Sequence, residues 1–228
     1  MANNEFEYKE VATGLPAETA IDMAAVLANF IPGLGGAVGN VLSGMGVGRK
    51  LDRVNEVLQG LADELRDFKS EVSEQSKQYV RSDEFEEILE KVLRQSAEER
   101  NEQRRQLLRQ FLMGAIVHPG SSYDTQRAIL RLLDSIEPED VLVLRAFAAA
   151  PTAEEMSGML GSIIGTLQRR LRDWTPQRIE AAVNRLNNLR VVHLTPNRMH
   201  TTMTAPGAAD LRGSIAPLGQ ELIVSLTR

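Results

Sequence analysis

The sequence predicts a mainly α protein in two parts, a helical bundle or coiled-coil hairpin over residues 17–118 and a smaller C-terminal domain over residues 119–228. Three observations lead to this prediction. A heptad repeat of apolar residues begins at Leu51, a second helical repeat runs from Phe85 to Ala115, and a polar connection at 118–122 precedes further helices and two strand-like runs. Residues 1–16 are expected to form a flexible tail before these parts.

Composition excludes several classes of protein. The 228 residues include 26 Lys and Arg against 31 Asp and Glu, a formal charge of −5, and no cysteine. Disulfides, cysteine-based zinc sites and thiol nucleophiles are therefore excluded. The tail carries Glu5, Glu7 and Glu10 where a secretory signal would be basic, so we expect a cytoplasmic protein.

The next segment is a run of 26 residues without a charge, between Asp22 and Arg49. About 20 apolar residues suffice to cross a bilayer as a helix. Pro32 interrupts this run, and its second half is rich in glycine at the spacing that lets helix backbones approach closely. Three interpretations stay open: a membrane-inserting segment, a buried helical hairpin and an oligomer interface. The candidate residues for membrane contact or self-association are Phe30, Ile31, Gly35, Gly39, Val41, Leu42, Gly44 and Gly48.

The heptad repeat predicts a long helix with one apolar seam. Its members, at alternating spacings of three and four, are Leu51, Val54, Leu58, Leu61, Leu65, Phe68 and Val72. The repeat from Phe85 to Ala115 predicts a second long helix, and the two are expected to pair as an antiparallel coiled-coil hairpin. Residues 95–105 are almost entirely polar, so this stretch is expected to project beyond the partner helix or to be solvated on all sides.

After the polar connection, apolar spacing predicts four helices over residues 124–136, 138–147, 152–171 and 175–189. Thr152 and Glu155 form a capping box before the third helix. Two strand-like runs follow at 191–194 and 199–204, separated by Pro196 and Asn197, which predicts a β-hairpin. Helix, helix, strand, turn, strand is the order of a winged helix.

The segment 215–223 strengthens this interpretation. It resembles the threonine-proline-leucine-glycine segment that begins the last helix of many bacterial winged-helix regulators, with Ala216 in place of threonine. If the domain binds DNA or a protein, the outward side chains of its fourth helix are the candidate contacts, since they are of types that meet base edges and phosphates. These residues are Gln177, Arg178, Asn184, Arg185 and Asn188. Residues 151–212 hold eight arginines and five acidic residues, which is a weak positive charge for a DNA-binding domain.

The uncharged segment joined to long amphipathic helices resembles the arrangement of α-helical pore-forming toxins and of bacterial abortive-infection membrane effectors. Residues 82–112 are also similar to uncharacterised bacterial helical proteins. These resemblances imply no catalytic residues. The glycines at 33, 35 and 39 miss the dinucleotide-binding spacing, and His118, His193 and His200 lack the spacing of paired metal ligands. We therefore predict no enzymatic activity, no cofactor and no metal site.

Two functional hypotheses follow. In the first, the chain is a non-enzymatic bacterial effector or assembly protein at the inner face of the membrane, which oligomerises through its coiled coil and engages the bilayer through residues 23–48. In the second, it is a dimeric winged-helix transcriptional regulator that binds DNA. The third hypothesis is a structural adaptor that neither engages a membrane nor binds DNA. The partners expected are a second copy of the chain, a lipid bilayer, and DNA or protein at the winged helix.

Overall fold

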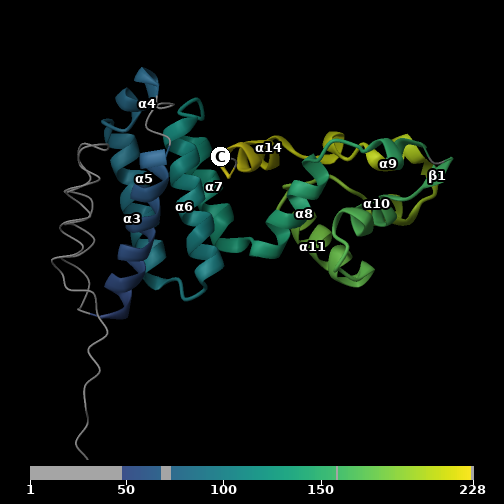
Figure 1. Cartoon of the computed structure of the whole chain (residues 1–228), viewed down its shortest axis with the longest axis horizontal. Coiled ribbons are helices and arrows are strands. Elements are labelled where there is room, and N and C mark those ends of the chain that lie inside the picture. Colours follow the sequence, from purple (N-terminus) through teal and green to yellow (C-terminus); the bar gives the residue numbers. More distant parts are fainter. Residues whose placement is uncertain (1–47, 68–72, 158, 227–228) are drawn as a thin grey trace, which may run out of the picture.

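The computed structural model describes residues 48–67, 73–157 and 159–226 (Figure 1). They are mainly helical, which confirms the predicted fold class at that level. Most of the uncharged segment lies outside the described residues, and so do Phe68 and Val72 of the predicted seam. None of the helices within the described ranges combines the length and the apolar character that a bilayer-crossing helix needs.

One group of helices, which we call the bundle, contains α3 (Arg49–Asp67), α4 (Glu74–Tyr79), α5 (Asp83–Glu98), α6 (Glu102–Val117), α7 (Tyr123–Ser135) and α14 (Pro217–Ser225). The heptad positions explain how α3 packs. Leu51, Val54, Leu58, Leu61 and Leu65 are all buried on one face, which contacts α5 and α6 of the same chain. The described part of the seam is therefore occupied by intramolecular contacts.

The second long helix that we predicted is two helices. α5 ends at Glu98 and α6 starts at Glu102, so the single continuous helix over 85–115 is wrong. Asn101 explains the restart, because its side-chain oxygen accepts hydrogen bonds from the backbone N–H groups of Gln103 and Arg104. Asparagine is favoured at the N-cap of a helix, where its side chain accepts from N–H groups that have no partner within the helix, and it is disfavoured in a helix interior. The polar stretch is thus a corner of the bundle.

The helix α14 returns to the bundle from far along the chain and packs against α6 and α7. Its approach to α6 is close at Gly114, where a Cβ atom would lie 2.1 Å from the backbone oxygen of Ser225. Ser121 also donates a hydrogen bond of 2.7 Å to Glu221 of α14. The bundle is therefore built from two separate stretches of sequence.

Residues 138–216, between these stretches, form a second group that we call the lobe. It contains α8 (Pro138–Ala148), α9 (Ala153–Ser157), β1 (Leu160–Gly161), α10 (Ile163–Arg170), α11 (Pro176–Asn188), α12 (Pro196–His200), β2 (Met203–Thr204), α13 (Ala205–Ala209) and the 3₁₀ turn η1 (Arg212–Ser214). The helices α8, α10 and α11 pack on one another. In Figure 1 the lobe projects sideways from the bundle, with α9 and β1 at its outer end.

Two details of the lobe differ from the prediction. The helix expected over 152–171 is interrupted, because α9 ends at Ser157 and α10 begins only at Ile163. The predicted hairpin between 191–194 and 199–204 is also wrong, since Met199 and His200 belong to α12, which Pro196 starts. Instead, β2 pairs with β1 in antiparallel register, and Val192 bridges to Ile215.

Candidate functional site

The predicted contact face of α11 is only partly free. Gln177, Asn184 and Asn188 are exposed, as the sequence predicted. Arg178, however, forms an ion pair with Glu139 of α8 and lies over the ring of Trp174, with 4.1 Å from its guanidinium carbon to the ring centroid. Its hydrogen bonds hold the pKa of Glu139 below the ordinary value.

Arg185 is also engaged within the chain. Its Nε and one terminal nitrogen donate to the carboxylate of Asp140, at 3.0 and 2.7 Å, and Asp140 is fully buried. This contact, more than any other, raises the pKa of Arg185. A buried carboxylate needs such a partner, because an unpaired charge in the interior is strongly destabilising. The two arginines expected to meet phosphates thus fasten α11 to α8.

A shallow pocket of about 470 Å³ adjoins this face, between α11 and α12. It is lined by Glu180, Asn184, Asn197, Met199, His200 and Thr201. His200 Nε2 lies 3.0 Å from the carboxylate of Glu180, whereas His193 is exposed and has no part in the pocket. Both histidines are exposed, and of the two it is His200 that lines the pocket. The described residues contain no cluster of three or more potential metal ligands.

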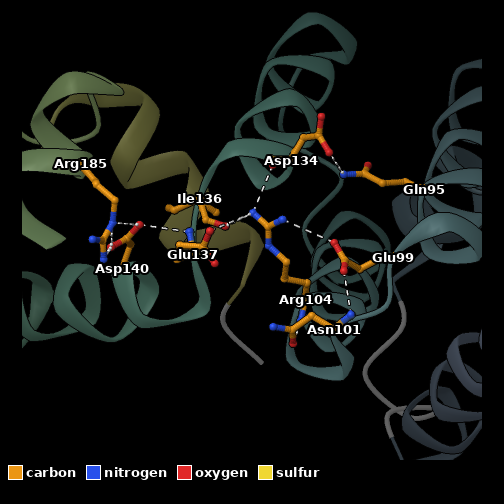
Figure 2. A network of polar contacts seen from close by, with 9 residues as sticks. All are labelled: Gln95, Glu99, Asn101, Arg104, Asp134, Ile136, Glu137, Asp140 and Arg185. Carbon is orange, nitrogen blue, oxygen red and sulfur yellow. Dashed lines mark hydrogen bonds and ion pairs between the residues drawn. The ribbon is translucent and has the colours of Figure 1, made fainter.

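A polar network joins the bundle to the lobe (Figure 2). Arg104 of α6 donates to the backbone oxygens of Asp134 and Ile136, at 3.2 and 2.9 Å, where α7 ends and the chain turns into α8. The same guanidinium lies 3.5 Å from Glu99 and 3.7 Å from Glu137. The last carbonyl groups of a helix have no partner within the helix, and one terminal nitrogen of Arg104 donates to both of these oxygens.

The network continues into the lobe. The backbone N–H of Glu137 donates to Asp140, the carboxylate that also receives Arg185. Polar contacts therefore run without interruption from α6, through the α7–α8 corner, to α11 (Figure 2). Sequence reasoning missed Arg104 and Asp140. Asp140 carried a usable signal, because an acidic residue two positions after Pro138 is typical of the first turn of a helix.

A second ion pair holds the outer half of the lobe together. Arg170 of α10 binds Glu155 of α9 at 2.7 Å, and both side chains are nearly inaccessible to solvent. Arg170 also donates to the backbone oxygens of Ala146, Ala149 and Ala209. Glu155 completes the predicted capping box with Thr152, which is confirmed by both reciprocal hydrogen bonds. The hydrogen bonds from Arg170 lower the pKa of Glu155 to about 2.

Arginine is used repeatedly in this way. Arg53 donates to Ala97 O at the end of α5, Arg145 to Leu226 O, and Arg212 to Ala148 O. Lysine, with a single ammonium group, cannot bridge several carbonyls in a plane. Structural demand thus accounts for a share of the arginines that follow Lys91, the last lysine of the sequence.

The candidate membrane and self-association residues up to Gly44 lie outside the described residues. Gly48 is described, and it has a φ of 132°, a conformation open to glycine and strained for other residues. Directly after it, Lys50 pairs with Glu98, and Arg53 reaches the last turn of α5. The start of α3 is thus fastened to the end of α5.

Comparison with known proteins gives no assignment, because no family model matches the chain and no curated protein or solved structure is significantly similar to it.

Proposed function

We propose that the protein is a non-enzymatic, membrane-associated effector or assembly protein in which residues 23–48 engage a lipid bilayer. The observation that carries this proposal is the run of 26 residues without a charge. Such a run is long enough to span the hydrocarbon core. The run ends directly before α3. Lys50 and Arg53 connect the start of α3 to the end of α5, so the inserted segment would be joined to a helix that is fixed within the bundle.

The contacts of the seam refine this proposal. Because α3 uses Leu51 through Leu65 against α5 and α6, self-association through this seam would require the bundle to open. We therefore propose that homo-oligomers form through the glycine-rich segment or another surface. The shifted carboxylate pKa values at Glu139 and Glu155 arise from ion pairs that brace helices, which supports a structural role for these groups.

Flotation with liposomes tests the membrane proposal. Full-length protein is expected to float with vesicles at high salt, and Val41→Asp together with Leu42→Asp is expected to prevent it, since each aspartate costs roughly 2.5–3.5 kcal/mol at the centre of a membrane helix. Leu142→Asp is the matched control, because Leu142 is 47% exposed on α8 and a charge is tolerated there. Wild-type protein that stays in solution at both low and high salt would contradict the proposal.

A second variant separates lipid contact from helix packing. Gly39→Leu would block close approach of two helices in an oligomer, yet leucine partitions into lipid better than glycine. We expect this variant to float at least as well as wild type and to lose self-association in crosslinking. Loss of flotation would favour a packed hairpin over an inserted segment.

A winged helix that binds DNA is the second candidate function. The order α8, α9, β1, α10, α11, in which a short strand precedes two helices, and the exposed Gln177, Asn184 and Asn188 favour it. The internal pairing of Arg178 and Arg185 weakens it, because phosphate contacts supply most non-specific affinity. We expect any retention on DNA at low salt to fall in Gln177→Glu and Asn188→Asp, and to be unchanged in Gln103→Glu on α6. Absence of retention at low salt would eliminate this candidate.

A further inference from the structure

The outer end of the lobe, where α9 and β1 lie (Figure 1), carries three exposed apolar side chains, Met156, Met159 and Leu160, which we call the tip. Met159 is 90% exposed, Leu160 70% and Met156 45%. The sequence predicted one continuous helix over residues 152–171, which would contain all three residues. Because α9 ends at Ser157 and Leu160 begins β1, they instead lie between the end of α9 and the start of β1, where all three are exposed.

Specific contacts fix the two elements that flank the tip. The capping box of Thr152 and Glu155 fixes the start of α9, and Glu155 also forms an ion pair with Arg170. On the other side, Leu160 pairs with Thr204 in the β1–β2 ladder. An exposed apolar cluster on an ordered support is typical of an interaction surface.

A shallow pocket borders the start of α9 and the end of α10. Arg169 and Arg172 are exposed and line it together with Thr152 and Glu154. Glu155 also borders it, but the guanidinium of Arg170 compensates its charge. The three arginines and two carboxylates that line the pocket carry a net positive charge, which lies beside α9, the helix that contains Met156.

The shape and size of the tip favour lipid over a second protein surface. A stable protein interface buries about 800 Å² on each partner and is built from some 20 residues, far more than three side chains at a projecting end supply. A few apolar side chains backed by arginines are, in contrast, enough for shallow contact with an anionic bilayer. Methionine adapts readily to such an irregular environment, because its side chain is unbranched and flexible.

We propose that the tip inserts Met156, Met159 and Leu160 into the headgroup boundary of a bilayer that contains anionic phospholipid, with Arg169 and Arg172 facing the lipid phosphates. This inference rests on the proposed membrane function, but it concerns residues that lie far from 23–48 in the sequence. The lobe would then provide a second contact with the membrane.

Labelling tests the proposal on the full-length protein. Since the chain has no cysteine, Met159→Cys accepts a single environment-sensitive fluorophore, and Asn188→Cys on the exposed face of α11 is the matched control. Vesicles of phosphatidylcholine and phosphatidylglycerol in equal amounts are added, with and without nitroxide-labelled lipid. We expect a blue shift and quenching by the nitroxide at position 159, and neither effect at position 188.

The outcomes separate the two proposals. Protein that floats with these vesicles while position 159 shows no quenching would overturn the tip and leave insertion of 23–48 in place. Protein that stays off the vesicles would overturn both. A concentration-dependent blue shift without vesicles would identify a second copy of the chain as the partner, against our proposal.

Two further variants test the residues directly. Met159→Glu with Leu160→Glu is expected to abolish quenching of a fluorophore at position 156 while flotation persists through 23–48. Arg169→Gln with Arg172→Gln is expected to weaken quenching at position 159 on anionic vesicles and to leave it unchanged on pure phosphatidylcholine. Equal quenching in all these variants would contradict insertion of the tip.

Discussion

The bundle and the lobe differ in the length of their helices, although arginines bind helix ends in both. In the bundle, four of the six helices have 13 to 19 residues and bury long apolar faces, such as that of α3 against α5 and α6. In the lobe, several elements have eight residues or fewer, and arginines from one element bind the carbonyl ends of another. Long helices gain stability from many small contacts, whereas short helices depend on a few specific ones. The lobe should therefore be far more sensitive to single polar substitutions.

The largest effect is expected for Arg170→Met. It leaves the buried carboxylate of Glu155 without its cation and three backbone oxygens without a donor. Removal of one partner from a buried pair typically costs about 3–5 kcal/mol. Urea unfolding should show an early transition in Trp174 fluorescence, which reports on the lobe, ahead of far-ultraviolet circular dichroism. Arg66→Met is the control, because its pair with Asp63 is exposed. Coincident transitions would show that lobe and bundle unfold as one unit.

Acid should weaken the lobe through the same pair. The pKa of Glu155 is about 2 in the folded state, below its ordinary value of 4.5, so its stabilising effect is present above pH 4.5 and is lost as the pH falls towards 2. Acid titration followed by Trp174 fluorescence should show this loss. In the double variant Glu155→Gln with Arg170→Met, the contribution of this pair is absent, and its stability should change less over that interval. An equal slope in both proteins would assign the acid sensitivity to other groups.

Gly114→Ala is expected to have an intermediate effect, in the bundle. The new Cβ would meet the backbone oxygen of Ser225 at 2.1 Å, so α14 must move away from α6. Overpacking of this kind costs about 1–3 kcal/mol. Thermal unfolding measures it, and Gly120→Ala is the control, because nothing lies within 4 Å of a Cβ there. Unchanged stability in Gly114→Ala would mean that α14 does not dock as described.

The smallest effect is a gain. Arg190 follows α11 with a φ of 57°, and the N–H groups of Arg190 and Val191 donate to Asn187 O and Leu186 O, as in a Schellman motif. Glycine adopts this conformation without strain, so Arg190→Gly should stabilise the lobe by roughly 0.5–1 kcal/mol. Trp174 fluorescence in urea should shift to a higher midpoint. A lower midpoint would indicate that the arginine side chain itself makes a stabilising contact.

The sequence predicted the bundle better than the lobe for a physical reason. Heptad spacing is repeated at Leu51 through Leu65, and repetition lets a pattern be recognised without knowledge of distant residues. The break between α5 and α6 depended on one asparagine cap, and the interruption of 152–171 depended on pairing between residues more than 40 positions apart. Arg178 and Arg185 were correctly placed on α11, but their partners Glu139 and Asp140 come from α8, and nothing in the local sequence predicts that these two helices pair.

The path of the chain also sets the motions open to the lobe. Within the part of the chain that the structure describes, the backbone passes from the bundle to the lobe after α7 and returns before α14, so two connections join the lobe to the bundle (Figure 1). A body attached by one linker can swivel freely, whereas a body attached at two separate places can only bend about the line that joins them. The lobe would therefore act as a lever, and a force applied at Met159 would be transmitted to α7 and α14 together.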